Sequence, residues 1–264
     1  MSKKIKTSPF AKKSLGQNFL IDQNYISKII SALNPQPDET IIEIGPGRGA
    51  LTQHLVESGA KIIAIELDRN LVPILQKEFA GYENFQVIED DALQIDFSKF
   101  KPQNSKLKLV ANLPYYISTA ILQRLIEQRE SFSEMILMLQ REVVERITAQ
   151  AGTSERGFLT VLVEAFCDSK KLFDVSPNAF RPAPKVWSSI VKLNVKESQS
   201  IENEGLFRDL LSLAFAQKRK TILNNLKVKF PDAQLILENC QIQPNRRAET
   251  LNLNEWLTLF SQIK

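Results

Sequence analysis

Two short motifs, each at the end of an apolar run, contain the residues best suited to chemistry. The first, Glu43-Ile-Gly-Pro-Gly-Arg-Gly49, ends the run at 40–44. Its glycines permit a sharp turn from strand to helix beneath a ligand, because glycine adopts positive φ and lets the backbone approach closely. Glu66 follows about 20 residues on, which is the spacing of an acid that binds a ribose diol. The pattern suits a dinucleotide site and an adenosyl site equally well, so both classes stay open at this point.

The second motif, Asn112-Leu113-Pro114-Tyr115, follows the run at 107–111. An exocyclic adenine amine is a poor nucleophile, because its lone pair is delocalised into the ring. The Asn112 side-chain oxygen and the backbone carbonyl of Leu113 or Pro114 can accept its two hydrogens and localise that lone pair. Pro114 fixes the backbone in advance, and Tyr115 can stack on a flipped base. The two motifs together predict methyl transfer to the N6 amine of adenine.

Further motifs run in a fixed order along nearly the whole chain. They are Lys13-Ser-Leu-Gly-Gln-Asn-Phe-Leu20, Ile65-Glu-Leu-Asp68, Asp90-Asp-Ala92, Met138-Leu-Gln-Arg-Glu-Val143, Ala179-Phe-Arg-Pro-Ala-Pro-Lys-Val186 and Ala214-Phe-Ala-Gln-Lys-Arg-Lys-Thr221. With the first two motifs they resemble the rRNA adenine N6,N6-dimethyltransferases, in particular the bacterial small-subunit (KsgA/RsmA) family. Trp187 departs from the family, which usually has a small or acidic residue there, and we interpret it as core packing in preference to an RNA contact.

The resemblance implies S-adenosyl-L-methionine as the methyl donor. It implies that the substrate is two adjacent adenosines in the 3′-terminal hairpin of 16S rRNA, within a pre-ribosomal particle. The cofactor residues that it implies are Asn18, Leu20, Gly45, Glu66, Asp91 and Asn112. The target-base residues that it implies are Asn112, Leu113, Pro114, Tyr115 and Phe180. Phe180 and Tyr115 would stack on opposite faces of the base, and such stacking contributes ~1–3 kcal/mol per base.

Charge is unevenly distributed along the chain. The net charge is +4, yet residues 1–20 contain lysines and no acid, residues 21–177 are net acidic and residues 178–264 are net basic. Because Lys and Arg supply most phosphate contacts, we expect the two basic ends to face RNA. The residues expected there are Lys12, Lys13, Arg181, Lys218, Arg219 and Lys220.

Composition excludes several other classes. A hydrophobic share of 43% suits a globular protein, and no run approaches the ~18 apolar residues of a membrane span. Cys167 and Cys240 have no zinc spacing, and His54 is the single histidine, so we expect no metal site. The basic N-terminus lacks the apolar stretch of a signal peptide. We therefore expect a cytoplasmic protein, monomeric and without a membrane partner.

The periodicity predicts an α/β fold with a parallel sheet and a small C-terminal helical domain. The resemblance implies that this sheet is of the Rossmann-like class I methyltransferase type. Strands are expected at 41–44, 61–65, 85–89, 107–111 and 135–139, with 171–175 and 188–195 as a closing pair. Helices are expected to start at Asp22, Asp68 and Ser118. Alternation of strands and helices implies a parallel sheet with the site at the carboxyl ends of its strands.

Three segments are expected. Residues 1–20 form a basic N-terminal segment that closes over the cofactor, and residues 21–198 form the S-adenosylmethionine-binding catalytic domain. Residues 199–264 form a small helical rRNA-recognition domain after the polar stretch 196–205. Its first helix is expected to bury Leu206, Leu210, Leu213 and Ala214.

Three alternative functions are weighed against this prediction. The first is a large-subunit rRNA adenine methyltransferase of the resistance type, but the pattern Ala214-Phe-Ala-Gln-Lys-Arg-Lys220 favours the small-subunit type. The second is a ribosome-assembly factor without essential catalysis, against which the complete Asn-Leu-Pro-Tyr, Glu66 and Asp91 set argues. The third is a nicotinamide oxidoreductase, which has no use for Asn112-Leu-Pro-Tyr or for basic chain ends.

Overall fold

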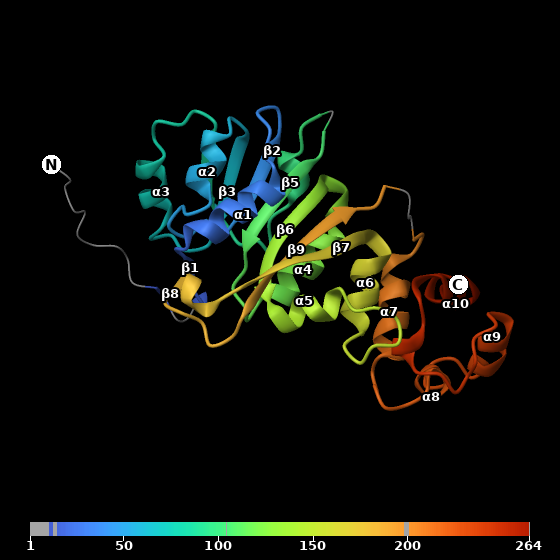
Figure 1. The fold of residues 1–264 in the computed structure, drawn as a ribbon. Helices are drawn as coiled ribbons and strands as arrows, with labels where there is room; N and C mark the ends of the chain where they lie inside the picture. Colours follow the sequence, from blue (N-terminus) through green and yellow to red (C-terminus); the bar gives the residue numbers. More distant parts are fainter. Residues whose placement is uncertain (1–10, 13–14, 104, 198–200, 264) are drawn as a thin grey trace. The chain divides into compact units, whose positions relative to one another are not determined.

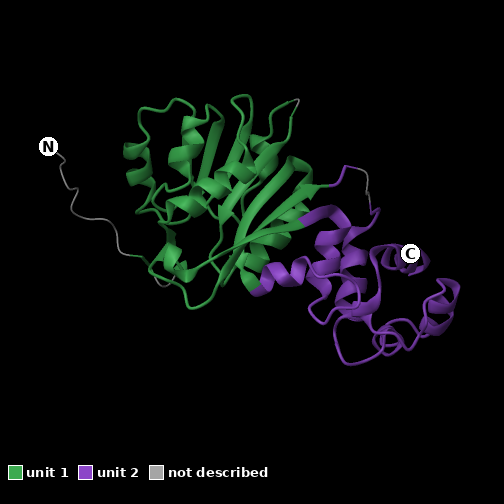
Figure 2. Ribbon diagram, viewed as in Figure 1, with its two compact units in different colours: residues 1–141, 170–195 green, residues 142–169, 196–264 purple. Residues whose placement is uncertain are grey.

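The computed structural model describes residues 11–12, 15–103, 105–197 and 201–263 (Figure 1). The chain divides into two compact units (Figure 2). Unit 1 comprises residues 1–141 and 170–195, and unit 2 comprises residues 142–169 and 196–264. The division differs from the expected boundary near residue 198, because residues 142–169 belong to the helical unit. No described helix is long and apolar enough to cross a membrane.

Unit 1 is built on a seven-stranded sheet with the strand order β4-β3-β2-β5-β6-β9-β7. Five neighbouring strands are parallel, as expected. They are β2 (Thr40–Ile44), β3 (Lys61–Glu66), β4 (Phe85–Glu89), β5 (Leu107–Asn112) and β6 (Phe132–Gln140). The closing pair is also confirmed: β9 (Ser188–Val195) runs antiparallel to β6 and lies beside β7 (Cys167–Val175). A separate two-stranded sheet joins β1 (Phe19–Leu20) to β8 (Phe180–Arg181).

Helices connect the strands of unit 1. They are α1 (Gln23–Leu33), α2 (Thr52–Glu57), α3 (Val72–Glu78) and α4 (Ser118–Glu127), with α5 (Arg141–Ile147) leading into unit 2. Short 3-10 turns occupy Phe97–Phe100, Arg129–Ser131 and Pro177–Ala179. Asp22 caps α1 by accepting from the amides of Asn24 and Tyr25, as expected. Asp68 does not cap α3, which begins four residues later at Val72.

The core of unit 1 lies between the sheet and helices α1, α2 and α3. Apolar side chains from these helices and from the strands of the sheet form one buried cluster. Its members include Ile26, Ile29, Leu33, Leu55, Leu75, Phe79, Ile41, Ile62, Val110, Ile136 and Ile190. Burial of these side chains fixes the strands side by side, so their carboxyl ends form one edge.

Unit 2 is helical, with α6 (Phe158–Phe166), α7 (Glu204–Ala214), α8 (Ile222–Leu226), α9 (Ala233–Asn239), α10 (Leu253–Ile263) and a 3-10 turn at Ala248–Thr250. α7 packs against both α6 and α8. Its buried face is Phe207, Leu210, Leu211 and Ala214, so Leu210 and Ala214 are buried as expected. Leu206 and Leu213 are only half-buried, and Phe207 and Leu211 are buried instead.

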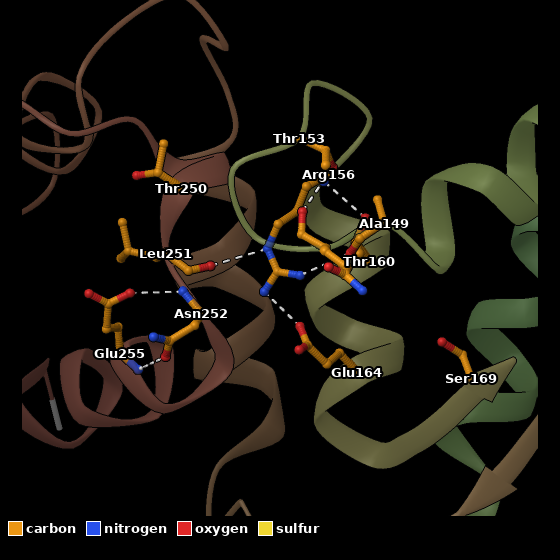
Figure 3. Close-up of polar contacts among 12 residues, drawn as sticks. Ala149, Thr153, Arg156, Thr160, Glu164, Ser169, Thr250, Leu251, Asn252 and Glu255 are labelled. Atoms are coloured by element: carbon orange, nitrogen blue, oxygen red, sulfur yellow. Dashed lines mark hydrogen bonds and ion pairs between the residues drawn. The ribbon is translucent and has the colours of Figure 1, made fainter.

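Arg156 joins the two chain segments of unit 2 and is 1% exposed (Figure 3). Its Nε donates to the Leu251 carbonyl at 3.1 Å and its Nη1 to the Ala149 carbonyl at 3.3 Å. Its Nη2 pairs with Glu164 Oε2 at 2.6 Å. A buried guanidinium is stable only when its donors are satisfied, so these contacts hold residues 142–169 and 196–264 together.

Candidate active site

A pocket opens where the parallel strands of unit 1 end. Its volume is about 810 Å³ when the space open to solvent is counted. Four strand ends line it, through the glycine loop after β2, Glu66 at the end of β3, Asp91 after β4 and Asn112 at the end of β5. Residues 15–19 of the N-terminal segment line it as well. The structure therefore brings together residues that the sequence motifs placed far apart along the chain.

The glycine loop requires glycine at position 47 in particular. Gly47 has φ +60°, and a Cβ atom there would lie 2.9 Å from the ring of Phe19. Arg48 also lies over the Phe19 ring, with its guanidinium carbon 4.5 Å from the ring centroid. The loop is thus packed directly against the N-terminal segment, which leaves no room for a side chain.

Glu66 faces the pocket with both of its oxygens oriented by backbone amides. Oε2 accepts from Gly47 N at 3.1 Å, and Oε1 accepts from Asp68 N at 2.8 Å. Burial raises the pKa of Glu66 above its usual value, and these two amides oppose that shift. A carboxylate held in this way retains lone pairs with which it can accept hydrogens from a diol.

Glu43, inside the first motif, lies behind Glu66 and is 2% exposed. The pKa of Glu43 is raised to about 7, because burial, with a smaller contribution from the charge of Glu66, outweighs the hydrogen bonds from Thr52 that lower it. The Thr52 hydroxyl donates to Glu43 Oε2 at 2.7 Å. Glu43 was not predicted from the sequence to be a second buried acid near Glu66, although it is the first residue of the glycine motif.

Asp91 lines the pocket just after the end of β4. Its Oδ1 accepts from Leu93 N at 2.9 Å, and its own amide donates to Asp90 Oδ1 at 2.7 Å. These two contacts fix the turn after β4 and keep the carboxylate at the pocket wall. An acceptor in this position can bind an amine, which adenine presents at N6.

Asn112 has a defined amide orientation. Its Nδ2 donates to the backbone carbonyl of Asn18 at 3.1 Å. A carbonyl oxygen can only accept, so the NH2 group must point at Asn18, and Oδ1 is left as the acceptor of this pocket residue.

The next three residues of the motif also line the pocket. Leu113 donates its amide to the Met138 carbonyl at 3.3 Å, and Pro114 accepts from Ile117 N at 3.2 Å. The Tyr115 hydroxyl lies 2.5 Å from Ser188 Oγ, which fixes the ring from β9. Burial raises the pKa of Tyr115, so the phenol is neutral at physiological pH. A role for Ser188 was not predicted from the sequence. The only signal in the sequence was its position two residues after the motif at 179–186.

Two expected site residues lie outside the pocket lining. Leu20 is 4% exposed and Phe180 is 1% exposed, and both belong to the hydrophobic core cluster. The pairing of β1 with β8 sets Leu20 opposite Phe180. Because their side chains are buried in this pair, the structure offers neither as a pocket surface, and a stacking role for Phe180 is not supported.

Of the expected RNA-binding residues, Lys12 is engaged within unit 1. Its Nζ lies 2.6 Å from Asp68 Oδ1, and Gln17 Nε2 donates to Asp68 Oδ2 at 3.0 Å. Asp68 is 3% exposed, and burial alone would raise its pKa. Hydrogen bonds from Lys12, the Asn70 amide and Gln17 outweigh burial and hold the pKa below its usual range. Lys12 is therefore not a free phosphate ligand in this structure.

The other expected RNA-binding residues are differently placed. Lys13 lies outside the described residues. Arg181 is exposed on unit 1, as is Trp187, which is 44% exposed and so is not core packing. The basic run 218–220 is exposed between α7 and α8 of unit 2, with Lys218 Nζ donating to the Ser154 carbonyl.

The fold and the pocket define a Rossmann-like class I methyltransferase. Three features define this class. They are the strand order, the glycine loop after the first parallel strand and the acids at the ends of the next two strands. The family can also be stated. The chain belongs to the ribosomal RNA adenine dimethylase family, which matches residues 10–264.

Individual relatives agree with this assignment. A Clostridium botulinum protein named ribosomal RNA small subunit methyltransferase A is 43% identical over 249 residues, which cover 92% of this chain and 90% of the relative. A crystal structure of a dimethyladenosine transferase from Plasmodium falciparum has a TM-score of 0.81 and 32% identity, covering 91% of this chain and 95% of that one. The 23S rRNA methyltransferase ErmE has a TM-score of 0.71 at 24% identity, covering 93% and 99%, and shows the shared fold. The resemblance seen in the sequence is thereby confirmed.

Proposed function

We propose that this chain is an S-adenosyl-L-methionine-dependent enzyme that dimethylates N6 of two adjacent adenosines in the 3′-terminal hairpin of 16S rRNA. The observation that supports this most directly is the amide orientation of Asn112. Its NH2 group is engaged by the Asn18 carbonyl at 3.1 Å, so its oxygen remains to accept from an amine in the pocket. Family membership supplies the adenine and the rRNA.

The pocket residues fit S-adenosylmethionine. The ribose diol would be held by Glu66, whose carboxylate is aimed by two backbone amides. The adenine amine would be held by Asp91, and the apolar wall includes Ile65 and Ala92. Gly45 and Gly47 of the glycine loop line the pocket with backbone alone, and the chain of the cofactor would lie against them. No metal enters this proposal.

When bound, S-adenosylmethionine supplies a methyl group on a sulfonium. Asn112 Oδ1 and the Leu113 carbonyl accept the two hydrogens of the target amine and so direct its lone pair. Leu113 is preferred to Pro114, whose carbonyl already accepts from the Ile117 amide. Tyr115, fixed by Ser188, offers its ring face to the flipped base. The methylated ammonium is acidic and loses its proton to water, so no strong base is needed.

The substrate particle and the setting of the reaction are part of the same proposal. The enzyme acts as a cytoplasmic monomer on small-subunit rRNA within a pre-ribosomal particle. The N-terminal segment contributes to the cofactor site, and unit 2 recognises rRNA through its exposed basic turn. Support comes from the relatives, which are named small-subunit methyltransferases.

One experiment tests the proposal and its alternatives. Under-methylated small subunits and, separately, large subunits are incubated with the chain and methyl-labelled S-adenosylmethionine, and the label is mapped by nuclease digestion. We expect label on N6 of two adjacent adenosines of 16S rRNA. Label on 23S rRNA would instead show a large-subunit enzyme. Stable particle binding without any label would show an assembly factor.

Cofactor choice is tested separately by titration calorimetry with S-adenosylhomocysteine and with NAD. We expect binding of S-adenosylhomocysteine only, because Asp91 provides a second acceptor beyond the ribose acid. Binding of NAD alone would overturn the cofactor assignment.

A further inference from the structure

The N-terminal segment contacts unit 1 at Asp68, at Asn112 and at the glycine loop. Lys12 and Gln17 both reach Asp68, at 2.6 and 3.0 Å. The next residue, Asn18, accepts from Asn112 Nδ2. Phe19 then packs against Gly47 and Arg48. A single short stretch of chain thus links the end of β3 to the end of β5 across the pocket.

Gln17 is oriented as firmly as Asn112. Its Oε1 accepts from the Lys12 amide at 2.7 Å, so its Nε2 must face the Asp68 carboxylate. Asp68 is 3% exposed, so water cannot replace a hydrogen-bond donor that its carboxylate loses. The hydrogen bonds from Lys12 and Gln17 therefore stabilise the Asp68 carboxylate more than they would stabilise an exposed acid. The contact therefore has a defined geometry on both sides, unlike a typical surface ion pair.

We propose that Asp68 is a positioning residue for the methyl-transfer step. Asp68 binds Gln17 and Lys12, and these contacts fix the position of the adjacent Asn18 carbonyl. The Asn18 carbonyl accepts from the Asn112 NH2 group, so that Asn112 Oδ1 remains the acceptor that faces the target amine. The inference rests on the proposed function for the role of Asn112. It implies that the wall of the cofactor pocket formed by residues 15–19 and the acceptor for the target amine are ordered by the same contact.

Asp68 also accepts from the Asn70 amide at 3.0 Å, so its replacement could disturb the turn before α3. The test therefore changes its partners. Gln17→Met and Lys12→Met remove the donors and leave the Asn70 contact intact. Lys12→Arg keeps the ion pair. Lys61→Met is the matched control, because Lys61 is exposed at the opposite end of β3.

The primary readout is the side-chain amide resonance of Asn112 in the nitrogen–proton NMR spectrum, assigned by its loss in Asn112→Asp. We expect it to shift in Gln17→Met and Lys12→Met and to stay in place in Lys12→Arg and Lys61→Met. At saturating S-adenosylmethionine, kcat on under-methylated small subunits should fall roughly ten- to a hundredfold in Gln17→Met, because misplacement of a reacting group by about 1 Å has such an effect.

Two results would overturn the inference. One is an Asn112 resonance that stays in place in both donor-removing variants. The other is weaker S-adenosylhomocysteine binding with kcat at saturation unchanged, since Asp68 would then serve the cofactor wall alone. If the resonance shifts as expected but the wild-type chain methylates no rRNA, the positioning contact stands and the proposed function fails.

Discussion

A single hydrogen bond decides which end of the Asn112 side-chain amide faces a ligand. The amide could present either its oxygen or its nitrogen to a ligand. The Asn18 carbonyl, 3.1 Å away, engages the nitrogen. That leaves an acceptor beside Tyr115, where a base amine needs one.

Replacing Asn112 by Ala should therefore abolish most of the transfer. Loss of one preorganised partner of this kind typically costs ~10²–10³ in rate, and rRNA binding should stay near normal because the fold around the pocket is kept. Single-turnover methylation of under-methylated small subunits measures the effect, with Asn24→Ala on exposed α1 surface as the control. Near-normal turnover by Asn112→Ala would mean that backbone carbonyls suffice.

Glu43 predicts a pH dependence of stability. Its pKa is raised from 4.5 to about 7, so the native state binds this proton more tightly than the unfolded chain does. Stability is therefore lost as the pH rises from 4.5 to about 7, and the cost is constant above that. Glu43→Gln keeps an acceptor for Thr52 and removes the cost, so it should stabilise the protein by about 1–3 kcal/mol at pH 8 and very little at pH 4.5.

Urea unfolding of Glu43→Gln at the two pH values checks this, with exposed Glu83→Gln as the control. An equal gain at both pH values would mean that ionisation of Glu43 is not its source.

At the scale of elements, the turn from β2 into α2 depends on Gly49. Gly49 has φ +79°, and a Cβ atom there would lie 2.7 Å from the Phe79 ring in the core. Gly49→Ala should therefore destabilise unit 1 by about 1–3 kcal/mol through backbone strain and overpacking.

The matched substitution is Gly81→Ala, where an added Cβ meets nothing within 4 Å. Its free energy of unfolding in urea should stay within about 0.5 kcal/mol of wild type, as for most surface changes. Equal effects of the two alanines would remove the steric explanation.

The strands of the sheet could be predicted because each is an apolar run that ends in a polar or glycine-rich motif, as β2 and β5 do. The pairing of β1 with β8 could not, since two strands of two residues each leave no periodic signal. That pairing buries Leu20 and Phe180, which is why both lie outside the pocket lining. The Asp68 contacts were also hidden, because an acid four residues before a helix resembles a cap.

At the scale of the whole molecule, the basic turn 218–220 of unit 2 predicts salt-dependent rRNA binding. Replacing Lys218, Arg219 and Lys220 by Gln should weaken binding to the small subunit. Each phosphate contact contributes roughly −0.7 to −0.9 to the slope of log K against log salt. Loss of up to about three contacts should therefore make this slope less negative by up to about three times that amount. Affinity for S-adenosylhomocysteine should not change, because this turn belongs to unit 2 and the pocket to unit 1.

Binding measured over a range of salt concentrations checks the slope. Lys99, Lys101 and Lys106, replaced together by Gln, remove the same charge from unit 1 and serve as the control. If both triple variants bind equally at every salt concentration, the turn at 218–220 makes no specific contribution, and Arg181 becomes the next residue to test.

The boundaries of unit 2 could be predicted from the sequence only in part. The linker at 196–205 was visible as a polar stretch, and α7 does begin at Glu204 beyond it. Residues 142–169 gave no such boundary, because α6 is almost wholly apolar and resembles a helix of the catalytic core. Packing of α6 against α7 and the contacts of Arg156, whose three partners come from both segments, tie them into one unit, and neither has a signature in sequence.

The interleaved order of the two units has a consequence for recombination. Most of β7 and all of β9 belong to residues 170–195 of unit 1, which separate the two segments of unit 2, so no single crossover can exchange unit 2 between two relatives. A chimera joined once near residue 196 would place Arg156 of one parent opposite the Leu251 region of the other. Exchange of the whole of unit 2 within this family would then require three crossovers, near residues 141, 169 and 195, inherited together.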